Sequence, residues 1–224
     1  MVIGNGLIAS AFSQYKNDDN IIIFASGVSN SSTNKSEEFE REINLLKRYL
    51  IKDKKLIYFS TCSITDNSKK SDYINHKIFM EDFIKNNHNN YIIFRLPIVV
   101  GKCNNKNTFY NNIREKILNK ETIMIYKNLT RYLIDIDDLS NILPNIINSV
   151  SRNLTIDTCF NNNLNILDIV NIMEDILEIK CDKIIETTDF TNNKIDNTEF
   201  LNKLKLYGFE NEKNYTEKIL KKYL

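Results

Sequence analysis

The stretch MVIGNGLIA, residues 1–9, decides the fold. Its short apolar run ends at once in Gly4-Asn5-Gly6, and apolar residues then recur at helical spacing as far as Tyr15. A strand that turns through glycines into a helix is typical of a dinucleotide-binding unit. Gly4 permits the tight turn, Gly6 lets a pyrophosphate approach the backbone, and the small Ala9 lets helix and strand pack closely. A tight strand-to-helix turn without a ligand is the alternative. Because the chain has only five glycines, the placement of two of them here favours binding.

Strands and helices alternate after this turn. Continuous β-rich runs at 20–24, 56–59 and 91–96 are typical of strands buried on both faces of a sheet. Helical spacing predicts helices at 36–50, capped by Ser36, and at 73–84. The alternation predicts an α/β fold with a Rossmann-like, doubly wound parallel sheet, right-handed crossovers and helices on both faces.

The alternation loosens past Gly101. We predict helices at 107–118, 137–150 and 165–177, short strands at 122–126 and 132–134, a strand on either side of the third helix, and two short helices around Gly208. The chain shows no internal repeat and no Pro/Gly linker. We therefore expect a Rossmann-like cofactor-binding region at 1–150 and a small C-terminal α/β substrate lobe at 151–224, with a soft, interleaved boundary.

Composition excludes several classes of function. The 224 residues are 42% hydrophobic and 26% charged, which is ordinary for a packed soluble protein. Thirty basic and 29 acidic side chains give a net charge of +1, so neither nucleic acid nor a membrane surface is expected as a partner. No apolar run approaches 18 residues, and the start lacks the features of a signal peptide. Four scattered cysteines and two histidines predict no disulfide framework and no metal site, and they favour a cytoplasmic location.

The motif Tyr73-Ile74-Asn75-His76-Lys77 places a phenol and an ammonium one helical turn apart. A neighbouring cation lowers the pKa of a phenol from about 10 toward working pH, so Tyr73 could move a proton to or from an alcohol or carbonyl. The alternative is a solvated Lys77 beside a partly buried Tyr73. Thr61 lies at the end of a predicted parallel strand, where open α/β sheets place their ligands. Its hydroxyl could bind a substrate oxygen beside Tyr73.

At this point the sequence resembles the extended short-chain dehydrogenase/reductase family, in its NAD-dependent epimerase/dehydratase branch, which modifies nucleotide sugars. The resemblance follows the family's motif order and covers nearly the whole chain. The matching stretches are GNGLIA at 4–9, FASG at 24–27, IYFSTCS at 57–63, YINHK at 73–77, RLPIVVG at 95–101 and RYLIDIDDL at 131–139.

The resemblance implies roles for individual residues. It assigns catalysis to Thr61, Tyr73 and Lys77, with Lys77 also binding the nicotinamide ribose of NAD or NADP. The implied cofactor-binding residues are Gly4, Gly6, Leu7, Ile8, Ala9, Ala25, Ser26, Gly27, Lys77 and Pro97. The implied substrate-binding residues are Cys62, Ser63 and Arg131, of which Arg131 would contact the diphosphate of the nucleotide sugar. A surface ion pair is the alternative for Arg131. His76 and His88 are expected at the surface, and Cys62 is expected to pack against Thr61.

The sequence also departs from the family. Only 18 residues separate Gly6 from Ala25, where the family has two further strands and helices. The first strand is therefore expected at the edge of the sheet, and the acidic residue that holds the adenosine ribose has no counterpart. Ile98 replaces a common Asn, and the short Thr61–Tyr73 spacing leaves Ser60 or Ser63 as alternative hydroxyl partners.

Two functions follow from these observations. The first is an NAD(P)-dependent epimerase or ketoreductase that acts on a nucleotide-activated sugar in surface polysaccharide biosynthesis, with a homodimer compatible with the family. The second is a catalytically inactive member that binds a nucleotide or a protein. The sequence decides neither the sugar nor the choice between NAD and NADP.

Overall fold

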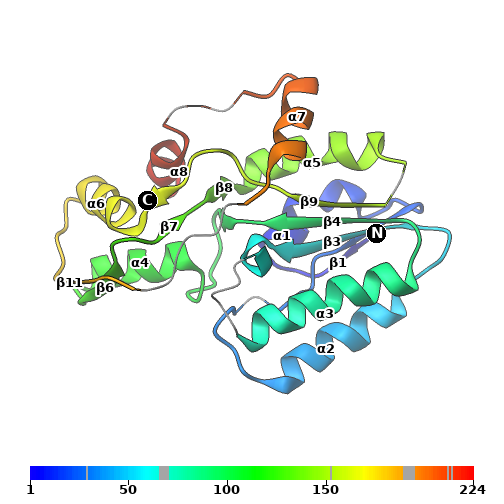
Figure 1. The fold of residues 1–224 in the computed structure, drawn as a ribbon, viewed down its shortest axis with the longest axis horizontal. Helices are drawn as coiled ribbons and strands as arrows, with labels where there is room; N and C mark the ends of the chain where they lie inside the picture. The colour runs from blue at the N-terminus through cyan, green and yellow to red at the C-terminus, as the bar shows by residue number, and fades with distance from the viewer. Residues whose placement is uncertain (29, 66–70, 152, 189–194, 211, 213) are drawn as a thin grey trace.

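The computed structural model describes residues 1–224 except 29, 66–70, 152, 189–194, 211 and 213. Its centre is a five-stranded sheet in the order β1-β2-β3-β4-β9, in which every neighbouring pair is parallel (Figure 1). The strands are β1 (Val2–Ile3), β2 (Ile21–Phe24), β3 (Lys55–Thr61), β4 (Tyr91–Leu96) and β9 (Leu154–Asp157). The predicted parallel α/β sheet is confirmed.

Helices cover both faces of this sheet. Helices α2 (Ser36–Arg48) and α3 (Asp72–Asn87) lie on one face, and α1 (Leu7–Ala11) and α5 (Ile136–Ser149) lie on the other (Figure 1). Strand β3 shows how the sequence achieves this arrangement. Leu56 and Tyr58 belong to the core under α2 and α3, while Ile57 and Phe59 belong to the core under α1 and α5. Both sets are buried, which explains the continuous apolar run.

The prediction that all crossovers are right-handed is wrong. Each successive strand of the sheet is added on the same side of the one before it. Crossovers that run over opposite faces must then have opposite hands. The connections through α2 and α3 therefore share one hand, while those that pass α1 and α5 have the other. The connection past α1 leads directly from the edge strand β1 to its neighbour β2.

The remaining elements form a lobe beside the sheet. Its helices are α4 (Phe109–Leu118), α6 (Ile166–Leu177) and α8 (Tyr215–Tyr223), whereas α7 (Thr198–Leu206) packs against β9 of the sheet (Figure 1). Its strands form three pairs, β5 (Ile98–Val100) with β8 (Leu133–Asp135), β6 (Ile123–Tyr126) with β11 (Lys183–Glu186), and β7 (Thr130–Arg131) with β10 (Leu164–Asn165). One hydrophobic core runs from the α1 and α5 face of the sheet into this lobe. The division at residue 150 stays a prediction.

Ion pairs and hydrogen bonds attach the end of the chain to the lobe. The hydroxyl of Tyr223 donates to Asp135 at 2.6 Å, and the ammonium of Lys222 donates to the same carboxylate at 2.7 Å. Helix α8 thereby closes over β8. None of the helices in the described ranges has the length and apolar character needed to span a membrane.

The N-terminal caps of α2 and α3 differ from each other, and the predicted cap of α2 is wrong. Ser36 does not cap α2, because it is the first helical residue and Lys35 occupies the cap position without a side-chain hydrogen bond. Ser71 does cap α3, since its hydroxyl accepts the N–H of Ile74 at 3.3 Å. This cap starts α3 at Asp72 and places Tyr73 in its first turn.

Strand β1 lies at the edge of the sheet, as predicted from the short first segment. Gly4 fixes how it ends. The residue has φ +128°, and a Cβ at this position would lie 2.4 Å from the carbonyl oxygen of Ala25. Only glycine permits both the backbone conformation and the close approach to the end of β2. Gly6 differs, since a Cβ there would have no atom within 4 Å.

We predict that Gly4→Ala lowers the free energy of unfolding by about 2–4 kcal/mol, because it combines backbone strain with a backbone clash. Gly6→Ala is the matched control, with an expected change of less than about 1 kcal/mol. Urea denaturation of both variants measures the difference. Equal stabilities for the two variants would contradict the close approach of Gly4 to Ala25.

Candidate active site

A cavity of about 990 Å³ opens at the carboxyl ends of β2, β3 and β4. Its lining includes Phe24, Thr61 and Leu96 at the ends of these strands, together with residues 97–99, 102–105, 107–109 and 130–132. The volume lies at the upper end of the range for small-molecule sites. The cavity therefore lies where ligands bind in open α/β sheets.

Most of the residues that the sequence singled out meet at this cavity. Those that line it are Gly6, Leu7, Ile8, Ala25, Ser26, Gly27, Thr61, Cys62, Ser63, Tyr73, Lys77, Pro97 and Arg131. Gly4 and Ala9 do not line it. Ala9 is a buried residue of α1, and Gly4 packs against the backbone of Ala25. Both therefore support the turn without lining the cavity. The individual roles of these residues stay predictions.

Tyr73 and Lys77 project from the first two turns of α3. The ammonium of Lys77 lies 5.9 Å from the centre of the Tyr73 ring. The hydroxyl of Tyr73 forms no hydrogen bond with another described residue, and both side chains border the cavity. The alternative of a solvated lysine is wrong, because Lys77 is only 2% exposed.

A buried carboxylate holds Lys77. Glu42 of α2 is fully buried, and its Oε1 accepts from the Lys77 ammonium at 2.9 Å and from the Tyr58 hydroxyl at 2.6 Å. Its Oε2 accepts the backbone N–H of Val28 at 2.7 Å and lies 3.1 Å from Nε2 of His76. The Lys77 ammonium also donates to the Tyr58 hydroxyl at 2.9 Å. Although burial alone raises the pKa of a carboxyl, Lys77 and these hydrogen bonds hold the pKa of Glu42 well below its usual value.

The expected lowering of the Tyr73 pKa is wrong for the protein without ligands. Burial raises the pKa of Tyr73 above 10, Lys77 opposes this effect, and the Glu42 carboxylate adds to it. The main physical reason is burial, which disfavours the charged phenolate, and Glu42 partly offsets the opposing effect of Lys77. Tyr73 is consequently protonated at neutral pH.

Thr61 ends β3 beside the cavity. Its hydroxyl oxygen accepts the N–H of Ser63 at 3.1 Å, which leaves the hydroxyl proton available to a ligand. Ser63 and Ser60 border the same cavity, so the sequence alternatives for the hydroxyl partner stay open. The thiol of Cys62 donates to the carbonyl of Arg95 at 3.1 Å, and it is buried. Cys62 thus packs beside Thr61 with its thiol already engaged.

The two histidines do not lie at the surface, and that expectation is wrong. His76 is buried between Glu42 and the ring of Phe39, whose centre lies 4.6 Å from the imidazole. His88 is buried where Nε2 lies 2.9 Å from the carbonyl oxygen of Lys54. In each histidine, Nε2 has a partner from a distant part of the chain. A local sequence pattern does not reveal such a partner.

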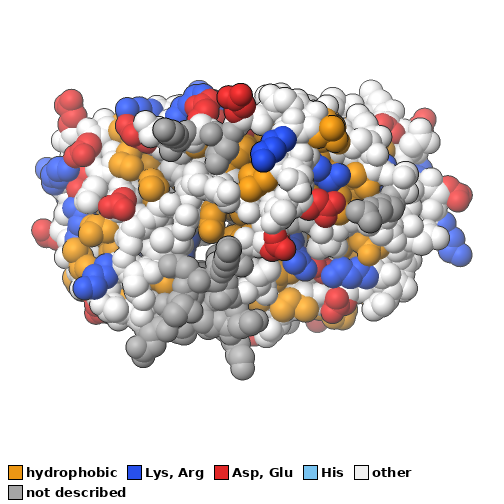
Figure 2. All heavy atoms as spheres, turned by 45° about the horizontal axis from the view of Figure 1, so that its top comes forward, with side chains coloured by type: hydrophobic (Ala, Val, Ile, Leu, Met, Phe, Trp, Pro, Cys, Tyr) orange, Lys and Arg blue, Asp and Glu red, His pale blue; other side chains and the backbone are white. Residues whose placement is uncertain are grey.

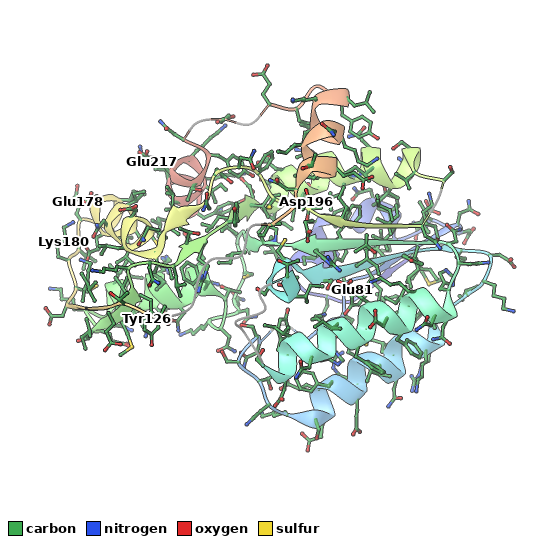
Figure 3. The ribbon with its side chains drawn as sticks, viewed as in Figure 1. Glu81, Tyr126, Glu178, Lys180, Asp196 and Glu217 are labelled. Atoms are coloured by element: carbon green, nitrogen blue, oxygen red, sulfur yellow. The ribbon has the colours of Figure 1, made fainter. Side chains whose placement is uncertain are left out.

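A second buried carboxylate fixes the other end of α3. Glu81 projects from α3 toward the sheet (Figure 3) and accepts from Nε and Nη2 of Arg95 at 2.9 and 2.8 Å. This bidentate pair joins α3 to β4, as the pair of Lys77 with Glu42 joins α3 to α2. Helix α3 is therefore held firmly at the turn that carries Lys77.

The charge of the cavity wall is one-sided. Four basic residues line it, namely Arg41, Lys77, Lys102 and Arg131. No Asp or Glu lines it in the part of the chain that the structure describes. In a protein with a net charge of +1, this local excess favours a ligand that carries several negative charges.

Sequence reasoning missed Glu42, Tyr58, Arg41 and Lys102. Glu42 left a signal, because it lies three residues after Phe39 and four before Leu46, inside the apolar stripe of α2. A charge in such a stripe calls for a buried partner. Lys102 and Arg41 left none, since an exposed basic residue on a helix or loop is ordinary.

Within the described ranges, no three His, Cys, Asp or Glu side chains are grouped so that they could hold a metal ion.

Comparisons with known proteins identify the fold. No family model and no curated protein matches the chain by sequence. Solved structures match it in shape, among them dTDP-4-dehydrorhamnose reductase from Bacillus anthracis in complex with NADP. That similarity has 16% identity and a TM-score of 0.67, and it covers 96% of this chain and 84% of the other.

Two epimerases are similar to the same extent. UDP-N-acetylglucosamine 4-epimerase from Methanobrevibacter ruminantium, in complex with UDP-N-acetylmuramic acid, has 16% identity and a TM-score of 0.65, over 99% of this chain and 80% of that one. UDP-glucuronic acid 4-epimerase from Bacillus cereus, in complex with UDP-glucuronic acid and NAD, has 17% identity and a TM-score of 0.66, over 98% and 79%. The chain therefore has a shortened Rossmann-like fold, shared with nucleotide-sugar epimerases and reductases.

Proposed function

We propose that this chain is an NAD(P)-dependent epimerase or ketoreductase that acts on a nucleotide-activated sugar, within the extended short-chain dehydrogenase/reductase family. The observation that carries the proposal is a single large cavity that combines a glycine turn, the Thr61–Tyr73–Lys77 trio and four basic residues without an acidic one. A dinucleotide and a nucleotide sugar each bring a pyrophosphate, which suits such a wall. Because activated sugars are the donors for polysaccharides, we propose surface polysaccharide biosynthesis as the setting.

The cavity fits a dinucleotide at the glycine turn. A Cβ at Gly6 would point into open space, so the backbone there is accessible to a phosphate. Gly6, Ala25 and Ser26 would hold the cofactor at this end, and Lys77 and Pro97 would border its nicotinamide end. When bound, the cofactor supplies the hydride acceptor or donor.

Lys77 keeps one donor for a ligand. An ammonium has three N–H donors, and Glu42 and Tyr58 accept two of them. We assign the third to a ribose hydroxyl of the cofactor, since Lys77 borders the cavity. Glu42 and Tyr58 thereby position the ammonium before the ligand arrives.

Tyr73 would move the proton. Its raised pKa keeps the phenol protonated at neutral pH, so it is ready to donate a proton to a sugar carbonyl in the direction of reduction. In the opposite direction the phenol must first lose its proton. Thr61 would hold the same oxygen through its hydroxyl, and Arg131 would contact the sugar-nucleotide diphosphate.

A catalytically inactive binding module is the second candidate. The charge balance between Lys77 and Glu42, together with the raised pKa of Tyr73, favours it. A nucleic-acid role has no such support, because acidic and basic side chains are interspersed on the face shown in Figure 2.

We predict that Tyr73→Phe lowers turnover of UDP- or dTDP-sugars by about 10²–10⁴-fold, because the proton donor is lost. Calorimetry with NAD⁺, NADH, NADP⁺ and NADPH should give the same affinities for the variant and the parent protein. Tyr49→Phe, at the end of α2 and outside the cavity, is the control and should keep full turnover. Binding without any turnover in the parent protein would favour the inactive module instead.

The buried ion pair predicts a pH dependence of stability. The pKa of Glu42 is lower in the folded chain than its ordinary 4.5, so its stabilising contribution is present above pH 4.5 and is lost as the pH falls below it. Glu42→Gln should lower the free energy of unfolding by about 3–5 kcal/mol at neutral pH, because the charge of Lys77 is left buried and unbalanced.

The same variant should show a shallower loss of stability in acid than the parent protein, as measured by urea unfolding at pH values from neutral to acidic. Glu40→Gln, on the exposed face of the same helix, is the control and should match the parent. If the free energy of unfolding fell equally steeply with decreasing pH in Glu42→Gln and in the parent protein, Glu42 would be excluded as the titrating group.

A further inference from the structure

Two consecutive residues of α2 hold the loop that follows β2. Arg41 donates from Nη1 to the Ser26 hydroxyl at 3.2 Å and from Nη2 to the Ser26 carbonyl at 3.1 Å. Glu42, the next residue, accepts the N–H of Val28 on the buried side of the same loop. The two opposite charges therefore hold residues 26–28 from different sides. Glu42 belongs to the interior, while Arg41 is exposed and lines the cavity.

The loop held by Arg41 lies against the glycine turn. A Cβ on Gly4 would lie 2.4 Å from the carbonyl oxygen of Ala25 and 3.2 Å from the backbone nitrogen of Ser26. Ser26 is thus in contact with the turn on one side and with the Arg41 guanidinium on the other. This series of contacts places Arg41 next to the turn, where Rossmann-like folds hold a pyrophosphate.

The short helix α1 contributes little positive potential to the glycine turn. Helix α1 has five residues, so few aligned peptide dipoles stand behind the turn. The charge of Lys77 is balanced by Glu42. Lys102 directly follows Gly101, where a Cβ would lie 3.0 Å from Cδ1 of Leu7 in α1. Arg41 differs from Lys102 because its guanidinium is held by hydrogen bonds to Ser26, and it has no ion pair to a described carboxylate.

The guanidinium of Arg41 is also prepared for an anion. Ser26 accepts two of its five N–H donors and fixes the plane of the group, which leaves three donors for a ligand. A planar guanidinium that is already oriented binds phosphate oxygens in pairs and loses less side-chain entropy on binding. Among the described residues of the cavity wall there is no Asp or Glu to compete for this guanidinium.

We propose that Arg41 binds the pyrophosphate of the dinucleotide and takes over, from α2, part of the cofactor recognition that the missing strands would have supplied. This inference rests on the proposed function. It assigns Arg41 to the pyrophosphate rather than to the 2′-phosphate of NADP because Ser26, which holds Arg41, contacts the glycine turn.

The test compares the affinities of ADP, NAD⁺ and NADP⁺, measured by calorimetry on the full chain at two salt concentrations. Arg41→Ala should weaken all three by a similar factor of about 10–100, because each contains the pyrophosphate. Arg41→Lys keeps the charge but loses the planar pair of donors, so it should fall between Arg41→Ala and the parent protein. Added salt should weaken binding to the parent more than to Arg41→Ala.

The control is Arg48→Ala, which removes an exposed arginine in the last turn of the same helix and outside the cavity. It should leave all three affinities unchanged. Equal affinities in Arg41→Ala and the parent would overturn the assignment, and so would a loss as large in Arg48→Ala. A loss for NADP⁺ alone would place Arg41 at the 2′-phosphate and overturn it as well. A parent protein that binds none of the three ligands would overturn the proposed function, and the inference with it.

Discussion

The ion pair between Glu42 and Lys77 is the interaction on which the site depends. An ionised carboxylate with no solvent exposure is tolerated only when its oxygens are fully partnered, and Glu42 draws its partners from the loop after β2, from β3 and from α3. Glu42 therefore holds the loop after β2, strand β3 and helix α3 in fixed positions relative to one another. The same pair constrains the loop sequence, since a Cβ at Gly27 would lie 2.8 Å from the Lys77 ammonium. Gly27 is needed here for close approach to an ammonium, although its backbone conformation is open to other residues.

The edge position of β1 affects more than the size of the sheet. In a doubly wound fold the first strand is central, and the helix after it leads away from the strands that carry the catalytic residues. Here the chain after α1 leads to β2, and β1 lies at the edge of the sheet. The connection from β1 to β2 past α1 therefore has the opposite hand to the connection from β2 to β3 through α2. The edge is short, with two residues in β1, so few backbone groups are exposed to pairing with another chain. Helix α2 contacts the loop beside the glycine turn, through Arg41 at Ser26 and Glu42 at Val28.

The sequence predicted the architecture well because periodicity and turn residues act locally. The runs 20–24, 56–59 and 91–96 became β2, β3 and β4, and the spacing of Tyr73 and Lys77 placed both at the cavity. What failed depended on contacts between distant segments. The hand of a crossover depends on which face a helix covers, and the acidity of Tyr73 depends on a carboxylate 31 positions earlier in the chain. The burial of His76 and His88 has the same origin, since each is covered by residues about 34 positions away.

The distribution of charge explains how a nearly neutral protein can select a polyanion. Exposed charges are screened beyond about 8–10 Å at physiological salt, so a net charge of +1 gives little attraction at long range. Inside the cavity the balance differs, because the basic residues of its wall have no acidic neighbour in the described lining. Lys77 is neutralised from within by Glu42, whereas Arg41 and Lys102 line the same cavity without an ion pair to a described carboxylate.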